Sequence, residues 1–107
     1  MNWYVAKIVF RITPVKASTV GQFDEHLRLI RAESLEQAFI KARLLGIREE
    51  DEGNEQSQAC WEFVNVSELM PLGELCDGAE VYSQVHEVRE AGAYIQLVHQ
   101  RASSLTA

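Results

Sequence analysis

The segment from Trp3 to Thr13, WYVAKIVFRIT, constrains the fold more than any other part of the chain. It is rich in aromatic and β-branched residues and contains neither Gly nor Pro, which predicts a β-strand. Alternate side chains of a strand point to opposite faces. One face is wholly apolar and should face the core, with Tyr4, Ala6, Ile8, Phe10 and Ile12. The other is half apolar and half cationic, with Trp3, Val5, Lys7, Val9 and Arg11. A strand of this kind needs shelter on both sides and belongs inside a sheet.

A second strand is predicted from Phe23 to Ala32, after a Pro- and Gly-containing loop over Pro14–Gln22. Its residues fall into two phases, an apolar one with Phe23, Leu27 and Leu29 and a polar one with Asp24, His26 and Arg28. This alternation is typical of a half-buried strand, here antiparallel to the first.

A helix is predicted to begin at Ser34 and to end at Gly46. The Ser34 hydroxyl can accept a hydrogen bond from the first turn, and Gln37 completes a capping box of the S-x-x-Q type. Apolar residues then recur at helical spacing, at Leu35, Ala38, Phe39, Ala42 and Leu45. Gly46 is placed to end the helix in a left-handed conformation.

The second half of the chain begins with an acidic linker, Glu49–Gln58, for which a solvated connection is favoured over a cation-binding loop because the calcium-loop spacing is missing. A third strand follows over Cys60–Val66. Ser67–Gly78 is interpreted as a connection, Ala79–Val88 as a fourth strand, and Glu90–Arg101 as a C-terminal helix.

These elements predict a single α+β domain, residues 1–107, in the order β-β-α-β-β-α. The expected architecture is a two-layer sandwich of a four-stranded, mainly antiparallel sheet with one helix on a face, together with a C-terminal helix. Sheet orders 2-1-3-4 and 1-2-4-3 both satisfy the connections. The first is preferred because it places the opening strand in the sheet interior.

Composition excludes several classes of protein. The chain has 107 residues and a net charge of −6 without a basic cluster, so nucleic-acid binding is not expected. Lys7 and Arg11 interrupt the only long apolar stretch, so no membrane span is expected either. Met1-Asn2-Trp3 lacks the pattern of an export signal, which predicts a cytoplasmic protein. Cys60 and Cys76 are then expected as free thiols.

Several blocks of sequence resemble an uncharacterised bacterial family, domain of unknown function 4288. They are WYVAKIVFRI, FDEHLRLIRAESLEQAFIKA, WEFVNVSEL and DGAEVYS, in this order, between Trp3 and about Val85. The resemblance implies a small stand-alone bacterial domain. It implies no catalytic residues.

The sequence assigns no catalytic, cofactor-binding or metal-ligating residue, and an enzyme is not favoured. The three histidines, His26, His86 and His99, share no ligand spacing, and the cysteines form no zinc pattern with them. The best enzymatic alternative is His86 oriented by Glu62 across a pair of strands, which depends on an unknown register.

The half-apolar face of the first strand is the candidate functional surface. This face has an apolar patch, formed by Trp3, Val5 and Val9, that the C-terminal helix or another chain must cover. The cationic residues Lys7 and Arg11 lie beside these apolar residues. The function favoured is a non-enzymatic interaction module that forms a homodimer through this face, with a further protein partner possible. Two alternatives stay open: an acidic, immunity-like inhibitor of a basic protein, and a small-molecule or anion site between the sheet and the Pro14–Gln22 loop.

Overall fold

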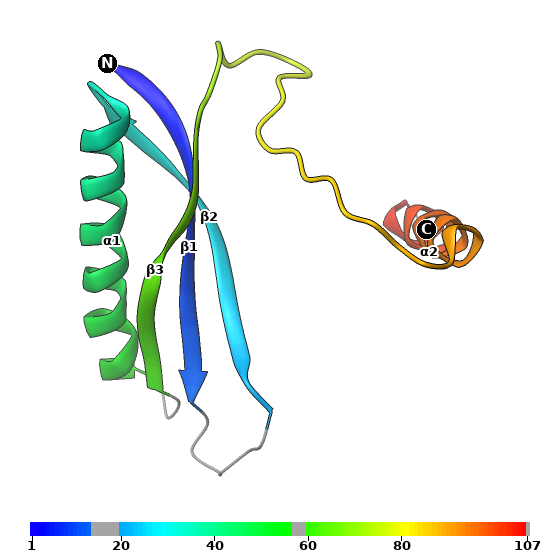
Figure 1. The fold of residues 1–107 in the computed structure, drawn as a ribbon, viewed down its shortest axis with the longest axis horizontal. Coiled ribbons are helices and arrows are strands. Elements are labelled where there is room, and N and C mark those ends of the chain that lie inside the picture. Colours follow the sequence, from blue (N-terminus) through cyan, green and yellow to red (C-terminus); the bar gives the residue numbers. More distant parts are fainter. Residues whose placement is uncertain (14–19, 57–59, 107) are drawn as a thin grey trace.

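The computed structural model describes residues 1–13, 20–56 and 60–106. In chain order its elements are β1 (Asn2–Thr13), β2 (Gln22–Ala32), α1 (Leu35–Gln56), β3 (Cys60–Pro71) and α2 (Ala91–Leu105) (Figure 1). The strands form a three-stranded sheet in the order β2-β1-β3, and both pairings are antiparallel. The α+β class and the central place of the opening strand are therefore as predicted. Residues 14–19 of the expected first loop and residues 57–59 of the expected linker lie outside the described residues.

The hydrophobic core lies between α1 and one face of β1. From β1 it takes Tyr4, Ala6, Ile8 and Phe10, which are all buried and alternate along the strand as predicted. From the neighbouring elements it takes Ile30, Ala32, Ala38 and Ala42. The two alanines of α1 have the shortest apolar side chains, so the helix comes close to the sheet along this stripe.

The start of α1 is capped in the way that the sequence predicts, with one difference. The backbone N–H of Gln37 donates to the Ser34 hydroxyl over 3.2 Å. The Gln37 side chain accepts from the backbone N–H of Glu33, at 2.6 Å, one residue before the position of a standard capping box.

Gly46 does not end the helix, which corrects the prediction. α1 continues to Gln56 and includes most of the segment interpreted as an acidic linker. A Cβ at position 46 would lie 2.5 Å from two ring atoms of Phe63 and 3.1 Å from Cγ2 of Ile8. Glycine is therefore required at position 46 because the helix and the sheet are in close contact there, and not because the chain makes a left-handed turn.

β2 presents its polar phase to α1, the opposite of what its hydrophobic pattern indicates. In the β1–β2 register, Ala6 is paired with Arg28 and Ile8 with His26, so these polar side chains share the face of the core. Arg28 forms an ion pair with Glu49 of α1 at 2.9 Å, and the ring of His26 lies 5.0 Å from that of Phe10. The acidic end of α1 thus provides the partner that allows a polar phase to face the helix.

β3 extends to Pro71, beyond the predicted end at Val66, and is irregular. Register shifts interrupt its pairing with β1 between Lys7 and Ile8 and between Val9 and Phe10. Each shift adds a residue to β3 and changes which phase points inward. As a result four side chains of β3 pack against the core at uneven spacing, namely Trp61, Phe63, Val66 and Leu69. Trp61 and Phe63 therefore lie on the core side of the sheet.

The predicted fourth strand is not present. Residues 72–90, all of them described, contain no strand, and beyond Tyr82 the chain extends away from the sheet (Figure 1). Strand-like alternation in 79–88 is therefore not sufficient for pairing within one chain. The C-terminal helix is confirmed, and α2 continues beyond the predicted end at Arg101, as far as Leu105.

We predict that Gly46→Ala destabilises the protein by about 1–3 kcal/mol, because the new methyl group collides with Phe63 in a packed core. This loss exceeds the gain of up to about 1 kcal/mol that Ala brings to a helix interior. Gly53→Ala is the matched control, since a Cβ at position 53 would meet no atom within 4 Å, and it should be neutral or stabilising. Urea unfolding of both variants measures the difference, and equal stabilities would contradict the close contact at Gly46.

Candidate functional site

The face of the sheet that points away from α1 is named the open face. On β1 it contains the five residues singled out in the sequence, Trp3, Val5, Lys7, Val9 and Arg11, because the intervening residues form the core. By register, β2 contributes Phe23, Glu25, Leu27, Leu29 and Arg31. On β3, Met70 is paired with Val5 and Glu68 with Lys7.

The apolar side chains of the open face are unevenly exposed. Phe23 is 59%, Leu29 53%, Leu27 47% and Trp3 37% exposed, whereas Val5 is only 2% exposed although it lies outside the core cluster. Antiparallel sheets that face water usually place polar side chains on that side. The row on β2 breaks this rule at three of its five positions, Phe23, Leu27 and Leu29, with Glu25 between the first two. These residues and Trp3 are named the apolar band.

Lys7 is engaged within its own chain. Its Nζ lies 3.1 Å from Glu68 Oε2 and 5.0 Å from the ring centroid of Tyr82. The Tyr82 hydroxyl donates to Glu68 at 2.5 Å. Hydrogen bonding by Tyr82 and then by Glu68 raises the pKa of Lys7, and the same Tyr82 hydroxyl, followed by Lys7, lowers the pKa of Glu68. Tyr82 therefore holds the segment after β3 against the open face.

The predicted candidate residues thus divide into two groups. Val5 is buried and Lys7 is paired, so neither is free to contact a partner. Trp3 and Arg11 are exposed and Val9 is half-buried, and the Arg31 guanidinium lies 5.7 Å from the Trp3 ring centroid. Sequence reasoning missed the β2 row, Phe23, Leu27 and Leu29, because it read that apolar phase as core. Their pairing with the outward phase of β1 was the missing information.

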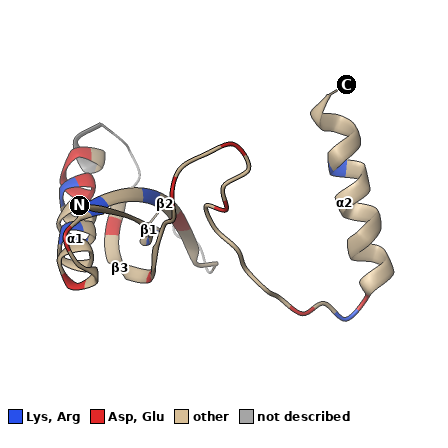
Figure 2. Cartoon of the chain, turned by 90° about the horizontal axis from the view of Figure 1, so that it is seen from above, with Lys and Arg blue, Asp and Glu red and all other residues tan. Residues whose placement is uncertain are grey.

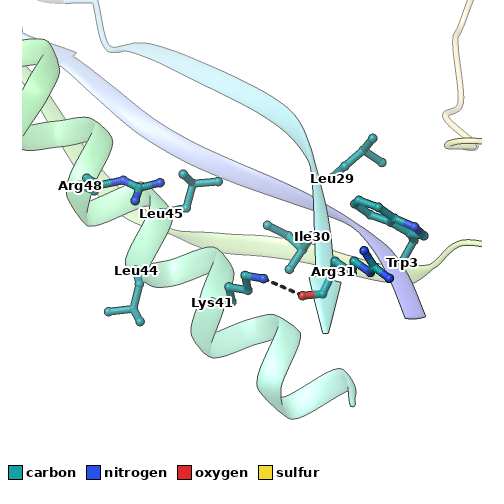
Figure 3. Close-up of a pocket in the computed structure, with 8 residues that line it drawn as sticks. All are labelled: Trp3, Leu29, Ile30, Arg31, Lys41, Leu44, Leu45 and Arg48. Carbon is teal, nitrogen blue, oxygen red and sulfur yellow. Dashed lines mark hydrogen bonds between the residues drawn. The ribbon is translucent and has the colours of Figure 1, made fainter. Parts of the chain in front are cut away.

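A hollow of about 480 Å³ lies where the edge strand β2 meets α1 (Figure 3). Its charged lining residues are all cations, Arg31, Lys41 and Arg48, in a chain of net charge −6. Lys41 Nζ donates to the backbone carbonyl of Arg31 over 2.8 Å (Figure 3). The apolar part of the lining is formed by Trp3, Leu29, Ile30, Leu44 and Leu45. This geometry favours an anionic group with an apolar portion.

The histidines and cysteines are distributed singly. His26 hydrogen-bonds Asp24 at 2.8 Å, whereas His86 contacts the Tyr94 hydroxyl at 3.2 Å. The pair of strands that would have brought His86 to Glu62 is not formed. Cys60 and Cys76 are free and exposed. Across the described ranges 1–13, 20–56 and 60–106, no three His, Cys, Asp or Glu side chains are grouped as metal ligands.

α2 is an apolar helix that contacts no other described element. None of its residues is buried, and among the described elements it packs against no helix or strand. A heptad-like stripe runs along it, with Ala91, Ile95, Val98, Ala102 and Leu105 at alternating spacings of four and three. The helix contains one cationic residue of the Lys and Arg type, Arg101, and no carboxylate, and most of it is tan in Figure 2.

The chain belongs to a family described as Domain of unknown function (DUF4288), whose model matches residues 3–83. No curated protein and no solved structure matches the chain. The match ends just after Tyr82, so α2 lies outside it. Within the described residues, no helix is both long and apolar enough to cross a membrane.

We predict that Tyr82→Phe raises the pKa of Glu68 towards its ordinary value, because the phenyl ring retains the packing but no longer donates a hydrogen bond. A lowered carboxyl pKa stabilises the folded chain above the ordinary pKa, and this contribution is lost as the pH falls through the lowered value. The NMR titration of the Glu68 carboxyl carbon measures the shift. Tyr94→Phe is the control, because it removes a distant hydroxyl and should leave the Glu68 titration unchanged. If the pKa of Glu68 in Tyr82→Phe equals that in the wild-type chain, the hydrogen bond between Tyr82 and Glu68 is contradicted.

Proposed function

We propose that this protein is a non-enzymatic interaction module that forms a homodimer through the open face. The observation that carries the proposal is the exposed band of Trp3, Phe23, Leu27 and Leu29 on a sheet with a helix on only one side. Exposed apolar side chains gathered on one face are typical of protein–protein contacts. A cytoplasmic location is part of the proposal, since Cys60 and Cys76 are exposed free thiols suited to a reducing compartment.

The composition of the band supports an interface over an ordinary solvated face. It contains two aromatic residues, Trp3 and Phe23, a type enriched at the centres of interfaces. Arg11 and Arg31 lie on the same face, and arginine is also enriched there. Lys7 and Val5, by contrast, support the face from within the chain. The proposed interface is therefore shifted from the middle of β1 towards β2.

A second exposed apolar stripe, on α1, provides the competing surface. Ile40, Leu44 and Ile47 recur at helical spacing and are all exposed. Charged residues, Lys41 and Arg43, lie between them. Leu35 and Phe39 continue this exposed surface towards the start of α1, and Arg43 lies over the Phe39 ring. The open face is favoured because the sheet has a helix on only one side, whereas α1 already buries its other face against the sheet.

We predict that the purified chain is a dimer at micromolar concentration and that Leu29→Glu raises its dissociation constant at least about tenfold, corresponding to about 1.4 kcal/mol. The substitution places a charge in the centre of the band without disturbing the core, because Leu29 is already half-exposed. Sedimentation equilibrium or light scattering across a dilution series measures the constant.

Ile40→Glu is the matched control for this experiment. It introduces the same charge at a similarly exposed apolar position, 60% against 53% exposed. Dimerisation should persist in this variant. A monomeric wild-type chain would overturn the proposal, and a dimer broken by Ile40→Glu but not by Leu29→Glu would assign the interface to α1.

A second candidate function, binding of a small anion, is favoured by the cationic hollow. Its lining includes three cations, Lys41 and Arg48 of α1 and Arg31 of β2, and no carboxylate. Anions bind where such cations surround a partly apolar recess. This hollow lies at the edge of the sheet between β2 and α1, and its described lining residues do not include residues 20–22 of the loop beside which the sequence suggested a cleft.

We predict that pyrophosphate raises the melting temperature of the wild-type chain and that Arg48→Gln removes the effect. Arg43→Gln is the matched control, because Arg43 stacks on Phe39 and does not line the hollow. A thermal-shift titration at constant ionic strength makes the comparison. An equal response in all three proteins would show non-specific charge screening and would contradict a site.

A further inference from the structure

We infer that α2 of one copy packs on the open face of a second copy, so that two chains exchange their C-terminal helices. This inference rests on the proposed homodimer and names the segment that covers its interface. One observation indicates what covers the open face. The same chain has an apolar sheet face on which no helix packs and an apolar helix, α2, that packs on no sheet.

The sequence of α2 alone does not account for a stable helix. A helix of its length, 15 residues, is marginal in water when isolated. Gly92 weakens its first turn, and its N-cap residue Glu90 makes no side-chain capping hydrogen bond. A helix of this kind forms where an apolar stripe is buried by a partner, which here must come from outside the helix.

The stripe and the band match in length and in character. From Ala91 to Leu105 the stripe is about 21 Å long at 1.5 Å per residue. From Phe23 to Leu29 the exposed row on β2 is about 20 Å long at 3.4 Å per residue. The single cationic residue of α2, Arg101, brings little charge to a mostly apolar surface.

The course of the chain favours a second copy over the chain's own sheet. Tyr82 is the last anchored residue, held by Glu68, and it already occupies part of the open face. Beyond it the chain leaves the sheet, and α2 lies apart from β1–β3 in both Figure 1 and Figure 2. The family match also ends at residue 83, so the helix is an addition to the domain that matches the family.

The area involved also favours a reciprocal exchange. One helix about 22 Å long and about 10 Å wide removes roughly 450 Å² from the two surfaces together. Such a contact alone is of the size of a crystal contact. Two exchanged helices remove about 900 Å² of accessible surface, without counting the additional area of interdigitating side chains. This value approaches the roughly 1,200 Å² of the smaller specific interfaces. In a twofold-symmetric dimer the same residues form both contacts, so the second contact needs no additional residues.

Crosslinking tests the exchange in the full chain. With Cys60 and Cys76 replaced by Ser, Leu27→Cys and Val98→Cys are made in separate chains of different mass. These positions are near the midpoints of the band and the stripe, so they lie close whichever way the helix runs. A short thiol-to-thiol crosslinker should join the mixed chains at least tenfold more efficiently than it joins either variant to itself. A chain that carries both cysteines should likewise give crosslinked dimers.

The possible outcomes distinguish the exchange of α2 from the homodimer itself. A product linked within one chain in the double variant would overturn the exchange and place α2 on its own sheet. A dimer by sedimentation without any 27–98 crosslink would also overturn the exchange and leave the homodimer standing. A monomer would remove both. Val98→Glu should weaken the dimer at least tenfold, while Gln96→Glu, off the stripe, should not, and equal effects would contradict the role of the stripe.

Discussion

The packing of α1 against the inward face of β1 is the contact on which the rest of the structure depends. It requires Gly46, whose missing side chain leaves room for Phe63 and Ile8, and it uses alanines at positions 38 and 42. Because one helix is held this close to one face, the sheet is a two-layer structure with its other face open. The apolar band and the residues that hold Tyr82 lie on the face that α1 does not cover.

The ion pairs of the fold also differ between the two faces of the sheet. On the α1 side, Arg28 is neutralised by Glu49 and the His26 imidazole is bonded to Asp24, so polar residues of β2 are accommodated beside the core. On the open side, Lys7 is neutralised by Glu68. Placing polar partners towards the helix leaves the apolar phase of β2 facing outward. This inversion is the physical basis of the proposed interface.

Sequence reasoning predicted much of the fold, and its errors have identifiable causes. The two phases of β1, the capped start of α1 and the order of the first three strands need only local pattern and connection rules. The inward phase of β2 depends on Glu49, an ion-pair partner far along the chain, and the inward residues of β3 depend on two bulges. Gly46 looks the same in sequence whether it ends a helix or permits a close contact. Of the candidate site, Trp3 and the face of β1 could be predicted, whereas Leu27 and Leu29 required the register.

Hydrogen exchange at two protein concentrations tests most directly whether the open face is covered by another copy. If it is, the amides of α2 and of Leu27–Arg31 are protected together at high concentration and lose that protection together on dilution to monomer. The amides of Tyr4–Phe10, in the core strand, stay protected at both concentrations. Protection of α2 that does not change with dilution, or α2 amides that exchange freely at every concentration, would contradict the account.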